Sequence, residues 1–347
     1  MNDCAAFLHI TFFFVGQVAF GPSFVFAEKP ASTKDLRINQ LQVVGTHNSY
    51  HLRPKASMFK LATSFNRGAE GWDYEHAPLD VQLDRGVRSF ELDLHYKRGD
   101  FEVFHVPILD DQTSCRDFAD CLRLVKTWSD RHPRHVPISF LLEIKDEVVG
   151  LDPEIKPVDK QGLDLIDKKI RDVFPDDRII TPDQVRGNFA TLEEAVLAGA
   201  WPLLEESRGK VLFILHEGGN NREMYVEGHP SLAGRAMFVR SEPGRPDAAT
   251  LVRDNPRDEE IPKLVKTGYF VRTTADGDVT RNPAAALDRR KRAWESGAQI
   301  VSTDYPPGET HAATGYTVTI ESGAPAIPNP INTPRELQNA EIVEPKN

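Results

Sequence analysis

The sequence has 347 residues and a formal net charge of −10 at pH 7. This length allows one large domain or two ordinary ones. The acidic balance argues against nucleic acid as a partner, because a phosphate backbone is bound by an excess of Lys and Arg. A bound metal ion can reverse the local potential, so the net charge does not exclude phosphoester chemistry.

Residues 1–27 are predicted to be a signal peptide. The stretch from Ala5 to Ala27 is apolar and almost uncharged, and it ends in Val25-Phe26-Ala27, a small-x-small pattern that signal peptidase cleaves. Gly21-Pro22 interrupts the apolar run, which favours a signal peptide over the alternative, an uncleaved anchor. We therefore expect a secreted or periplasmic protein.

Two cysteines, Cys115 and Cys121, lie in the predicted mature chain. In an oxidising compartment such a closely spaced pair can close a small loop at the start of a helix. This favours a disulfide, and two buried free thiols are the alternative.

Strand-like and helix-like segments alternate along the middle of the chain. Several strand candidates are continuous apolar runs, as is typical of parallel strands buried on both faces. The candidates are Leu41–Gly45, Arg88–Leu94, Phe101–His105, Ile138–Ile144, Lys210–His216, Arg235–Arg240, Tyr269–Thr273 and Gln299–Asp304. Amphipathic helices are expected at Phe118–Arg131, Gly162–Phe174, Thr191–Ala198 and Ala284–Ser296.

Eight strands with mostly helical connections predict a single-domain (β/α)8 TIM barrel, regular or distorted, over residues 28–324. An open doubly wound sheet is the alternative, but no Gly-rich phosphate loop follows the first strand. Residues 325–347 are polar and Pro-rich, and we expect a loosely ordered tail there.

Polar residues stand where the first four predicted strands end, the end at which such barrels carry their active sites. Residues two apart on a strand point to the same face, so side chains such as Glu91 and Asp93 share one face. The polar residues at these strand ends are His47, Asn48, Glu91, Asp93, His105, Glu143 and Lys145.

Three carboxylates this close together require a counter-cation. A hard divalent ion with oxygen ligands suits the set, which points to Ca²⁺ and less well to Mg²⁺, whereas zinc would more often take the histidines. His47 and His105 then remain free for proton transfer at a phosphodiester, one on the attacking oxygen and one on the leaving alcohol. The expected metal ligands are Asn48, Glu91, Asp93 and Glu143.

Four segments resemble motifs of the phosphatidylinositol-specific phospholipase C family, most closely its secreted bacterial calcium-dependent branch. Gly45-Thr46-His47-Asn48-Ser49-Tyr50 is similar to the start of the catalytic X region, and Arg88-Ser89-Phe90-Glu91-Leu92-Asp93 to the second-strand motif. Phe104-His105 resembles the second histidine motif and Leu141-Leu142-Glu143 the fourth-strand glutamate. The resemblance extends in order from about Leu41 to Pro306.

This resemblance implies that His47 and His105 are the catalytic pair and that the four oxygen donors bind calcium. It implies attack by an inositol hydroxyl of the substrate on phosphorus, which releases a lipid alcohol and a cyclic phosphate. His105 is the expected acid and His47 the base or a stabiliser of the transition state, a division that the sequence leaves open. Lys145, His216 and Arg272 are candidates for substrate contacts, although each could equally hold a neighbouring carboxylate.

The expected partner is a phosphoinositide or related phosphodiester, bound by a monomer with transient contact to a membrane surface. No lipid-targeting domain or basic amphipathic helix is evident, so the lipid nature of the substrate depends on the resemblance.

Three alternatives remain. A glycerophosphodiester phosphodiesterase also has a barrel, a metal and two histidines, but that family begins with His-Arg-Gly, where this chain has His47-Asn48-Ser49. A non-catalytic, calcium-dependent binding protein for phosphates or polyols is the second alternative. A glycoside hydrolase is the third, and it would leave both histidines without a role.

Overall fold

The computed structural model describes Met1 and residues 33–146 and 149–344. The predicted signal peptide lies outside the described residues. Within the described ranges, no helix has the length and apolar character needed to cross a membrane.

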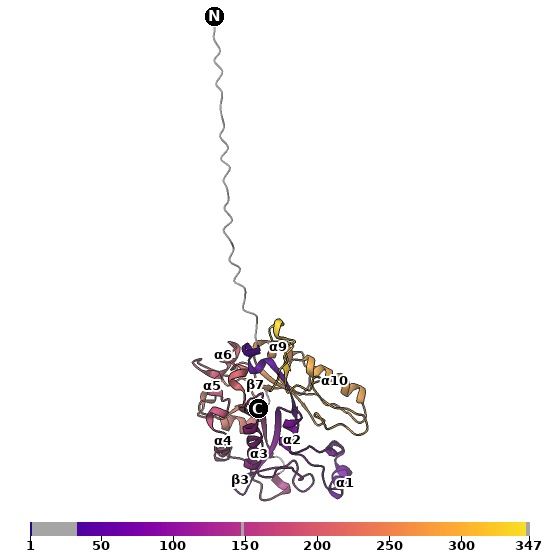
Figure 1. Cartoon of the computed structure of the whole chain (residues 1–347). Coiled ribbons are helices and arrows are strands. Elements are labelled where there is room, and N and C mark those ends of the chain that lie inside the picture. The colour runs from indigo at the N-terminus through magenta and orange to yellow at the C-terminus, as the bar shows by residue number, and fades with distance from the viewer. Residues whose placement is uncertain (2–32, 147–148, 345–347) are drawn as a thin grey trace. The chain divides into compact units, whose positions relative to one another are not determined.

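Eight parallel strands form a nearly closed barrel, which confirms the predicted fold (Figure 1). An isolated bridge between Arg240 and Thr250 connects the two outermost strands and brings the sheet close to closure. In sheet order the strands are β6 (Met237–Val239), β5 (Val211–Leu215), β4 (Ile138–Ile144), β2 (Ser89–Lys97), β1 (Leu41–Thr46), β9 (Ile300–Thr303), β8 (Phe270–Thr274) and β7 (Thr250–Val252).

One predicted barrel strand is wrong and one was missed. The segment Phe101–His105 contributes instead to β3 (Asp100–Val103), which pairs with β2 in antiparallel fashion outside the barrel. Arg98 and Gly99 connect the two strands with φ angles of 54° and 80°, the paired positive values of a tight hairpin turn. The missing barrel strand is β7, whose three residues are too few to produce a pattern in the sequence.

Helices surround the barrel, with α4, α5 and α6 along one side and α10 on the other (Figure 1). The four predicted helices correspond to α3, α4, α6 and α10, and the Thr191 hydroxyl caps α6 by accepting a hydrogen bond from the Glu194 backbone at 3.1 Å. The helices are α1 (Ala56–Phe65), α2 (Leu79–Asp84), α3 (Phe118–Arg131), α4 (Lys160–Val173), α5 (Pro182–Arg186), α6 (Leu192–Leu197), α7 (Leu204–Ser207), α8 (Gly219–Val226), α9 (Glu260–Thr267) and α10 (Pro283–Glu295). Short 3-10 turns are η1 (Thr33–Asp35), η2 (Ile38–Gln40), η3 (Arg67–Trp72), η4 (Val149–Leu151), η5 (Asp176–Arg178), η6 (Pro230–Leu232) and η7 (Arg335–Leu337).

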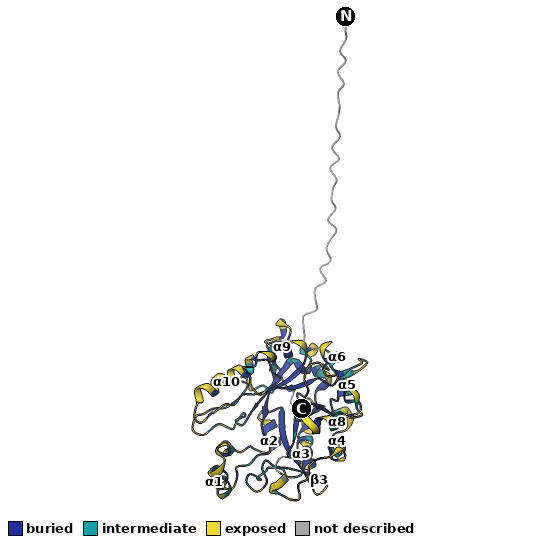
Figure 2. Cartoon of the chain, turned by 180° about the vertical axis from the view of Figure 1, so that it is seen from behind, coloured by how far each residue is buried: buried dark blue, intermediate teal, exposed yellow. Residues whose placement is uncertain are grey.

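The core consists of the barrel strands and the inner faces of the helices, as the burial colours of Figure 2 show. Aromatic rings from neighbouring strands pack on one another, with the Phe140 and Phe213 ring centroids 4.9 Å apart. A disulfide joins Cys115, in the loop before α3, to Cys121 in the first turn of that helix, which confirms the predicted pairing. The strands are thus held rigidly enough to position the polar residues at their ends.

The C-terminal segment is packed, and the expectation of a loosely ordered tail is wrong for residues 325–344. The short strand β10 (Ile327–Pro328) pairs antiparallel with β1, and the buried Asn329 amide donates to the Gly297 carbonyl at 2.5 Å. Leu337 and Ile342 are buried. These contacts come from single residues without periodicity, so the sequence pattern gives no sign of them.

Replacing Glu344 with glutamine is expected to lower the free energy of unfolding. The Glu344 carboxylate accepts from Nε of Arg88 at 2.8 Å, and this arginine is only 3% exposed. A buried charge without its partner costs about 1–3 kcal/mol or more. Urea denaturation of this variant beside Glu341→Gln, a change at an exposed position of the same segment, provides the measurement. Equal stabilities for the two variants would contradict the prediction.

Candidate active site

The turn after β1 brings His47 and Asn48 to the C-terminal end of the barrel. Asn48 is buried and has a φ of 45°, a left-handed conformation that asparagine adopts more readily than most residues. The backbone N–H of Ser49 donates to the Glu91 carbonyl at 2.9 Å, which ties this turn to β2. The motif that contains His47 and Asn48 and the motif that contains Glu91 and Asp93 therefore lie side by side.

His47 lies between two carboxylates. Its Nδ1 is 2.8 Å from Oδ1 of Asp304, which directly follows β9, and its Nε2 is 3.8 Å from Oε1 of Glu91. Burial alone would lower the pKa of His47, but the Asp304 and Glu91 carboxylates outweigh burial and raise this pKa to about 10. The imidazole remains 40% exposed, so it can reach a substrate.

His105 has a carboxylate partner of its own. It follows the hairpin strand β3, and its Nδ1 is 2.7 Å from Oδ2 of Asp110, which is fully buried. The Trp72 ring and the imidazole meet in a T-shaped contact, with centroids 5.3 Å apart. The side chain is 18% exposed.

The predicted carboxylate ligands lie on neighbouring strands, with Asp93 of β2 directly opposite Glu143 of β4. Two cations accompany them in this structure. Nζ of Lys145 is 2.7 Å from Oε1 of Glu143 and 3.2 Å from Oδ2 of Asp93, and Nη2 of Arg272 is 2.7 Å from Oε2 of Glu91. Lys145 and Arg272 thus hold carboxylates here, the second of the two roles considered for them.

Burial acts differently on the two carboxylates of β2. It raises the pKa of Asp93 to about 6 despite the ion pair with Lys145, and neither oxygen of Asp93 accepts a hydrogen bond among the described residues. Burial would also raise the pKa of Glu91, but Arg272 and His47 overcome it and lower the pKa to about 2. Lys145 and Arg272 therefore neutralise only part of the negative charge of the three carboxylates Glu91, Asp93 and Glu143.

This donor set fits a hard divalent cation. Ligand atoms of Glu91, Glu143 and His216 lie within 4.8 Å of one another, and the two oxygens of Asp93, which accept no hydrogen bond among the described residues, belong to the same strand ends. The Tyr50 hydroxyl donates to Oδ1 of Asn48 at 3.4 Å, and the pKa of Tyr50 is raised by burial and by nearby Asp93, so Asn48 borders the cluster. An oxygen-rich set of this kind suits Ca²⁺. His216 is the one nitrogen donor, and its Nδ1 is buried without a hydrogen-bond partner among the described residues.

Sequence reasoning missed several residues that support the two histidines. The His76 ring bridges Oε2 of Glu309 at 2.6 Å and the His47 carbonyl at 3.0 Å, and so fixes the backbone of His47. Asp110 and His51 contact each other beside His105. These residues lie in loops, where no periodic pattern marks them, although a histidine four positions after His47 was a visible signal.

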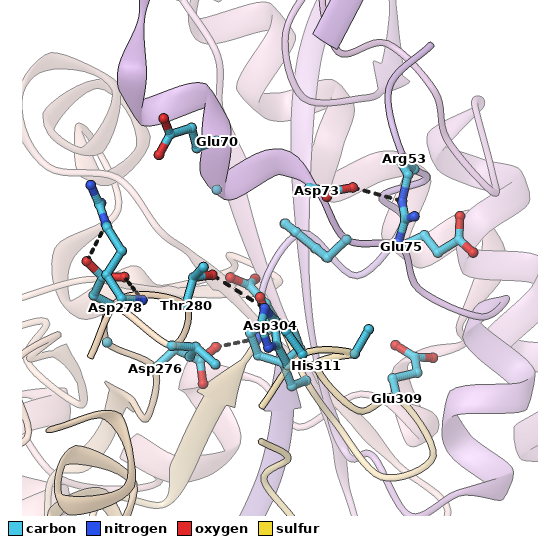
Figure 3. Close-up of a pocket in the computed structure, with 18 of the residues that line it drawn as sticks. Arg53, Glu70, Asp73, Glu75, Asp276, Asp278, Thr280, Asp304, Glu309 and His311 are labelled. Atoms are coloured by element: carbon cyan, nitrogen blue, oxygen red, sulfur yellow. Dashed lines mark hydrogen bonds and ion pairs between the residues drawn. The ribbon is translucent and has the colours of Figure 1, made fainter. Parts of the chain in front are cut away.

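A cavity of about 850 Å³ adjoins the site, but its lining residues do not include His47, His105 or the four predicted metal ligands. Asp304, the partner of His47, lines it together with Tyr74. Figure 3 shows Glu70 and Asp73 on one wall facing Asp276 and Asp278 on the other. Its volume is in the range of small-molecule sites, and it reaches His47 only through Asp304.

A (β/α) barrel with two carboxylate-bound imidazoles and an oxygen-rich cluster at the C-terminal ends of its strands has the features of metal-dependent phosphodiesterases. The family model described as phosphoinositide phospholipase C, Ca²⁺-dependent, matches residues 36–99 and 95–330. The chain belongs to this family of calcium-dependent phosphoinositide phospholipases C, which are phosphoric diester hydrolases.

Solved structures share the fold. A Ca²⁺-dependent phosphatidylinositol-specific phospholipase C from Streptomyces antibioticus is 23% identical in sequence, with a TM-score of 0.55. The match covers 77% of this chain and 94% of the Streptomyces chain. A calcium-dependent phosphoinositol-specific phospholipase C from a Gram-negative Pseudomonas species, in a myoinositol complex, is 18% identical in sequence, with a TM-score of 0.56. That match covers 85% of this chain and 96% of the Pseudomonas chain. At sequence identities of 18% and 23%, these two comparisons show that the chain shares the fold of these enzymes. No curated protein sequence matches the chain significantly.

Proposed function

We propose that this protein cleaves phosphatidylinositol-type phosphodiesters by attack of a hydroxyl of the substrate's own inositol on phosphorus. One observation carries the proposal: His47 and His105 are each bound through Nδ1 to a carboxylate, at 2.8 and 2.7 Å, beside an oxygen-rich cluster. Two imidazoles so held can act as base and acid on one phosphodiester.

The reaction transfers the phosphoryl group from the lipid alcohol to a hydroxyl of the same substrate's inositol. The neutral form of His47, which a cation held at Glu91 would favour by offsetting a carboxylate that raises the pKa of His47, takes the proton of the attacking inositol hydroxyl as the hydroxyl oxygen bonds to phosphorus. The bond from phosphorus to the lipid alcohol breaks, and His105 gives its proton to the departing oxygen. The products are a cyclic inositol phosphate and diacylglycerol, and proton exchange with water returns both imidazoles to their starting states.

Calcium is the cofactor of this family, and in the proposal Asn48, Glu91, Asp93 and Glu143 hold it. When bound, it would offset the charge on the phosphoryl oxygens and lower the pKa of the attacking hydroxyl. Lys145 and Arg272 keep the carboxylates in place, and His216 lies close enough to contact an inositol hydroxyl or the metal. We also propose a monomer that acts outside the cytoplasm and does not bind nucleic acid, in line with the predicted signal peptide and the net charge of −10.

The substrate class is tested by product analysis. Purified protein with calcium is expected to release diacylglycerol from phosphatidylinositol and to leave glycerophosphocholine intact. Cleavage of glycerophosphocholine without release of diacylglycerol would contradict the proposal and indicate a glycerophosphodiester phosphodiesterase.

Helix α1 supports contact with a lipid surface. It borders the cavity through Phe59, while Leu61 and Phe65 are 48% and 66% exposed on the same helix. Lys55 and Lys60, both exposed, add positive charge beside these apolar groups in an otherwise acidic protein. Apolar side chains flanked by lysines suit an anionic membrane surface.

Replacing Leu61 and Phe65 together with serine is expected to weaken binding to phosphatidylinositol vesicles about tenfold or more, since each buried apolar side chain contributes about 1.5–3 kcal/mol. Cleavage of a short-chain, monomeric phosphatidylinositol should remain unchanged. Leu197→Ser, at a position 51% exposed on α6, is the matched control and should bind vesicles like the unaltered protein. Equal vesicle binding by all three proteins would refute a role for α1.

A further inference from the structure

His216 brings an imidazole nitrogen to the carboxylate cluster. It directly follows β5, and its backbone N–H donates to the carbonyl of Leu142 in β4 at 2.8 Å, which fixes the residue beside the strand that carries Glu143. The side chain is 9% exposed, and its Nδ1 is buried without a hydrogen-bond partner among the described residues. A buried polar atom that has no partner in the protein points to a bound ion or water.

The distances around this nitrogen suit a shared cation. Nδ1 of His216 lies 4.0 Å from Oε1 of Glu91, which is too far for a hydrogen bond. Two ligands of one ion, each bound at about 2.3–2.6 Å, lie about 3–5 Å apart. A ligand atom of Glu143 lies within 4.8 Å of those of Glu91 and His216. All three side chains can therefore reach one ion.

The neighbouring cations do not take the oxygen of Glu91 that lies near His216. Nη2 of Arg272 contacts Oε2 of Glu91 at 2.7 Å, and Nζ of Lys145 contacts Oε1 of Glu143 at 2.7 Å. Oε1 of Glu91, the oxygen 4.0 Å from His216, accepts no hydrogen bond among the described residues. An ion between Glu91 and His216 would therefore leave the pair of Glu91 with Arg272 intact.

We propose that Nδ1 of His216 is a ligand of the metal, so that the site combines oxygen donors with one nitrogen donor. Imidazole nitrogen suits softer divalent ions, whereas Ca²⁺ prefers oxygen. His216 therefore sets the metal preference of the site, which binds a softer ion of similar size to Ca²⁺, such as Cd²⁺, more tightly than Ca²⁺ itself. This inference rests on the proposed function, in which Glu91 and Glu143 hold the metal.

Cadmium NMR tests the nitrogen ligand without measuring activity. Protein labelled with ¹⁵N in its histidines receives one equivalent of ¹¹³Cd²⁺, and a nitrogen ligand splits the cadmium signal into a doublet. We expect a doublet from the unaltered protein and a single line from His216→Asn, whose amide oxygen can take the place of Nδ1. His229→Asn is the matched control and should keep the doublet, because this half-buried histidine contacts the Ala233 carbonyl through Nδ1 and lies outside the site.

Calorimetric titration of the same proteins measures the metal preference. The loss of a group that merely orients a metal ligand costs about 10–100-fold in affinity, so His216→Asn should weaken Cd²⁺ binding by at least about tenfold. Its Kd for Ca²⁺ should change by less than about threefold, because asparagine supplies an oxygen donor. A larger loss of affinity for Ca²⁺ than for Cd²⁺ would overturn the inference.

Two results of the NMR experiment would also overturn it: a single cadmium line from the unaltered protein, or a doublet that persists in His216→Asn and so comes from another histidine. Either result would leave the oxygen ligands of the proposed function standing. His216→Gln gives the same comparison if the asparagine variant does not fold. An unaltered protein that binds neither ion would show that the metal site of the proposed function is wrong, and the inference would fall with it.

Discussion

His105→Ala is expected to lower kcat for phosphatidylinositol by about 10²–10⁴-fold, the range over which a positioned acid or base contributes. The loss follows because the departing alcohol would leave as an unprotonated alkoxide. His47→Ala should cause a loss of similar size, since the attacking hydroxyl would keep its proton. The measurement is the initial rate of diacylglycerol release at saturating calcium.

His132→Ala provides the control for these two variants. This histidine directly follows α3, stacks on Trp128 and lies outside the site, so the rate of the variant should stay near that of the unaltered protein. A His105→Ala or His47→Ala protein that is folded and retains more than about a tenth of the activity would refute the acid–base assignment, because general acid–base catalysis contributes at least about 10²-fold.

Calcium is expected to stabilise the fold through the carboxylate cluster. At a free concentration one hundred times its dissociation constant, a ligand that binds only the folded state adds about 2.7 kcal/mol to the free energy of unfolding. Asp93→Asn should abolish most of this gain, because it removes one of the four proposed ligands. The same change should alter the stability of the calcium-free protein little, because neither oxygen of Asp93 accepts a hydrogen bond among the described residues and its ion-pair partner Lys145 keeps the shorter contact with Glu143.

The measurement is a thermal melt of both proteins in calcium and in EGTA. Asp247→Asn, at a buried carboxylate bound to Arg222 and outside the cluster, is the control that should keep the calcium response. If Asp93→Asn melted like the unaltered protein in calcium, the metal would lie elsewhere in the protein.

The sequence was sufficient to predict the barrel because its longer strands are continuous apolar runs. Ile138–Ile144 occurs as predicted, and β1, β2 and β5 differ only at their ends. The hairpin strand β3 was mistaken for a barrel strand, since apolar content does not reveal whether a partner strand runs parallel or antiparallel. The three-residue β7 and the packed C-terminal segment left no periodic signal.

The candidate site was predictable where its residues end long strands. His47, Glu91, Asp93 and Glu143 come together because β1, β2 and β4 are neighbours in register. Asp110, His51 and His76 were not predictable in the same way, because loops bring them to the histidines and loop conformation depends on single turns such as the one at Ile108. The pairing of Lys145 and Arg272 with carboxylates also required the geometry, since both roles were open for each.

Phosphorus NMR of the purified protein with phosphatidylinositol, first in calcium and then in EGTA, identifies the first product and its dependence on calcium in one experiment. We expect the signal of a cyclic inositol phosphate that forms in calcium, disappears in EGTA and is missing in the His47→Ala and His105→Ala proteins. An acyclic inositol phosphate as the first product, or cleavage that continues unchanged in EGTA, would contradict attack by the substrate's own hydroxyl at a calcium site.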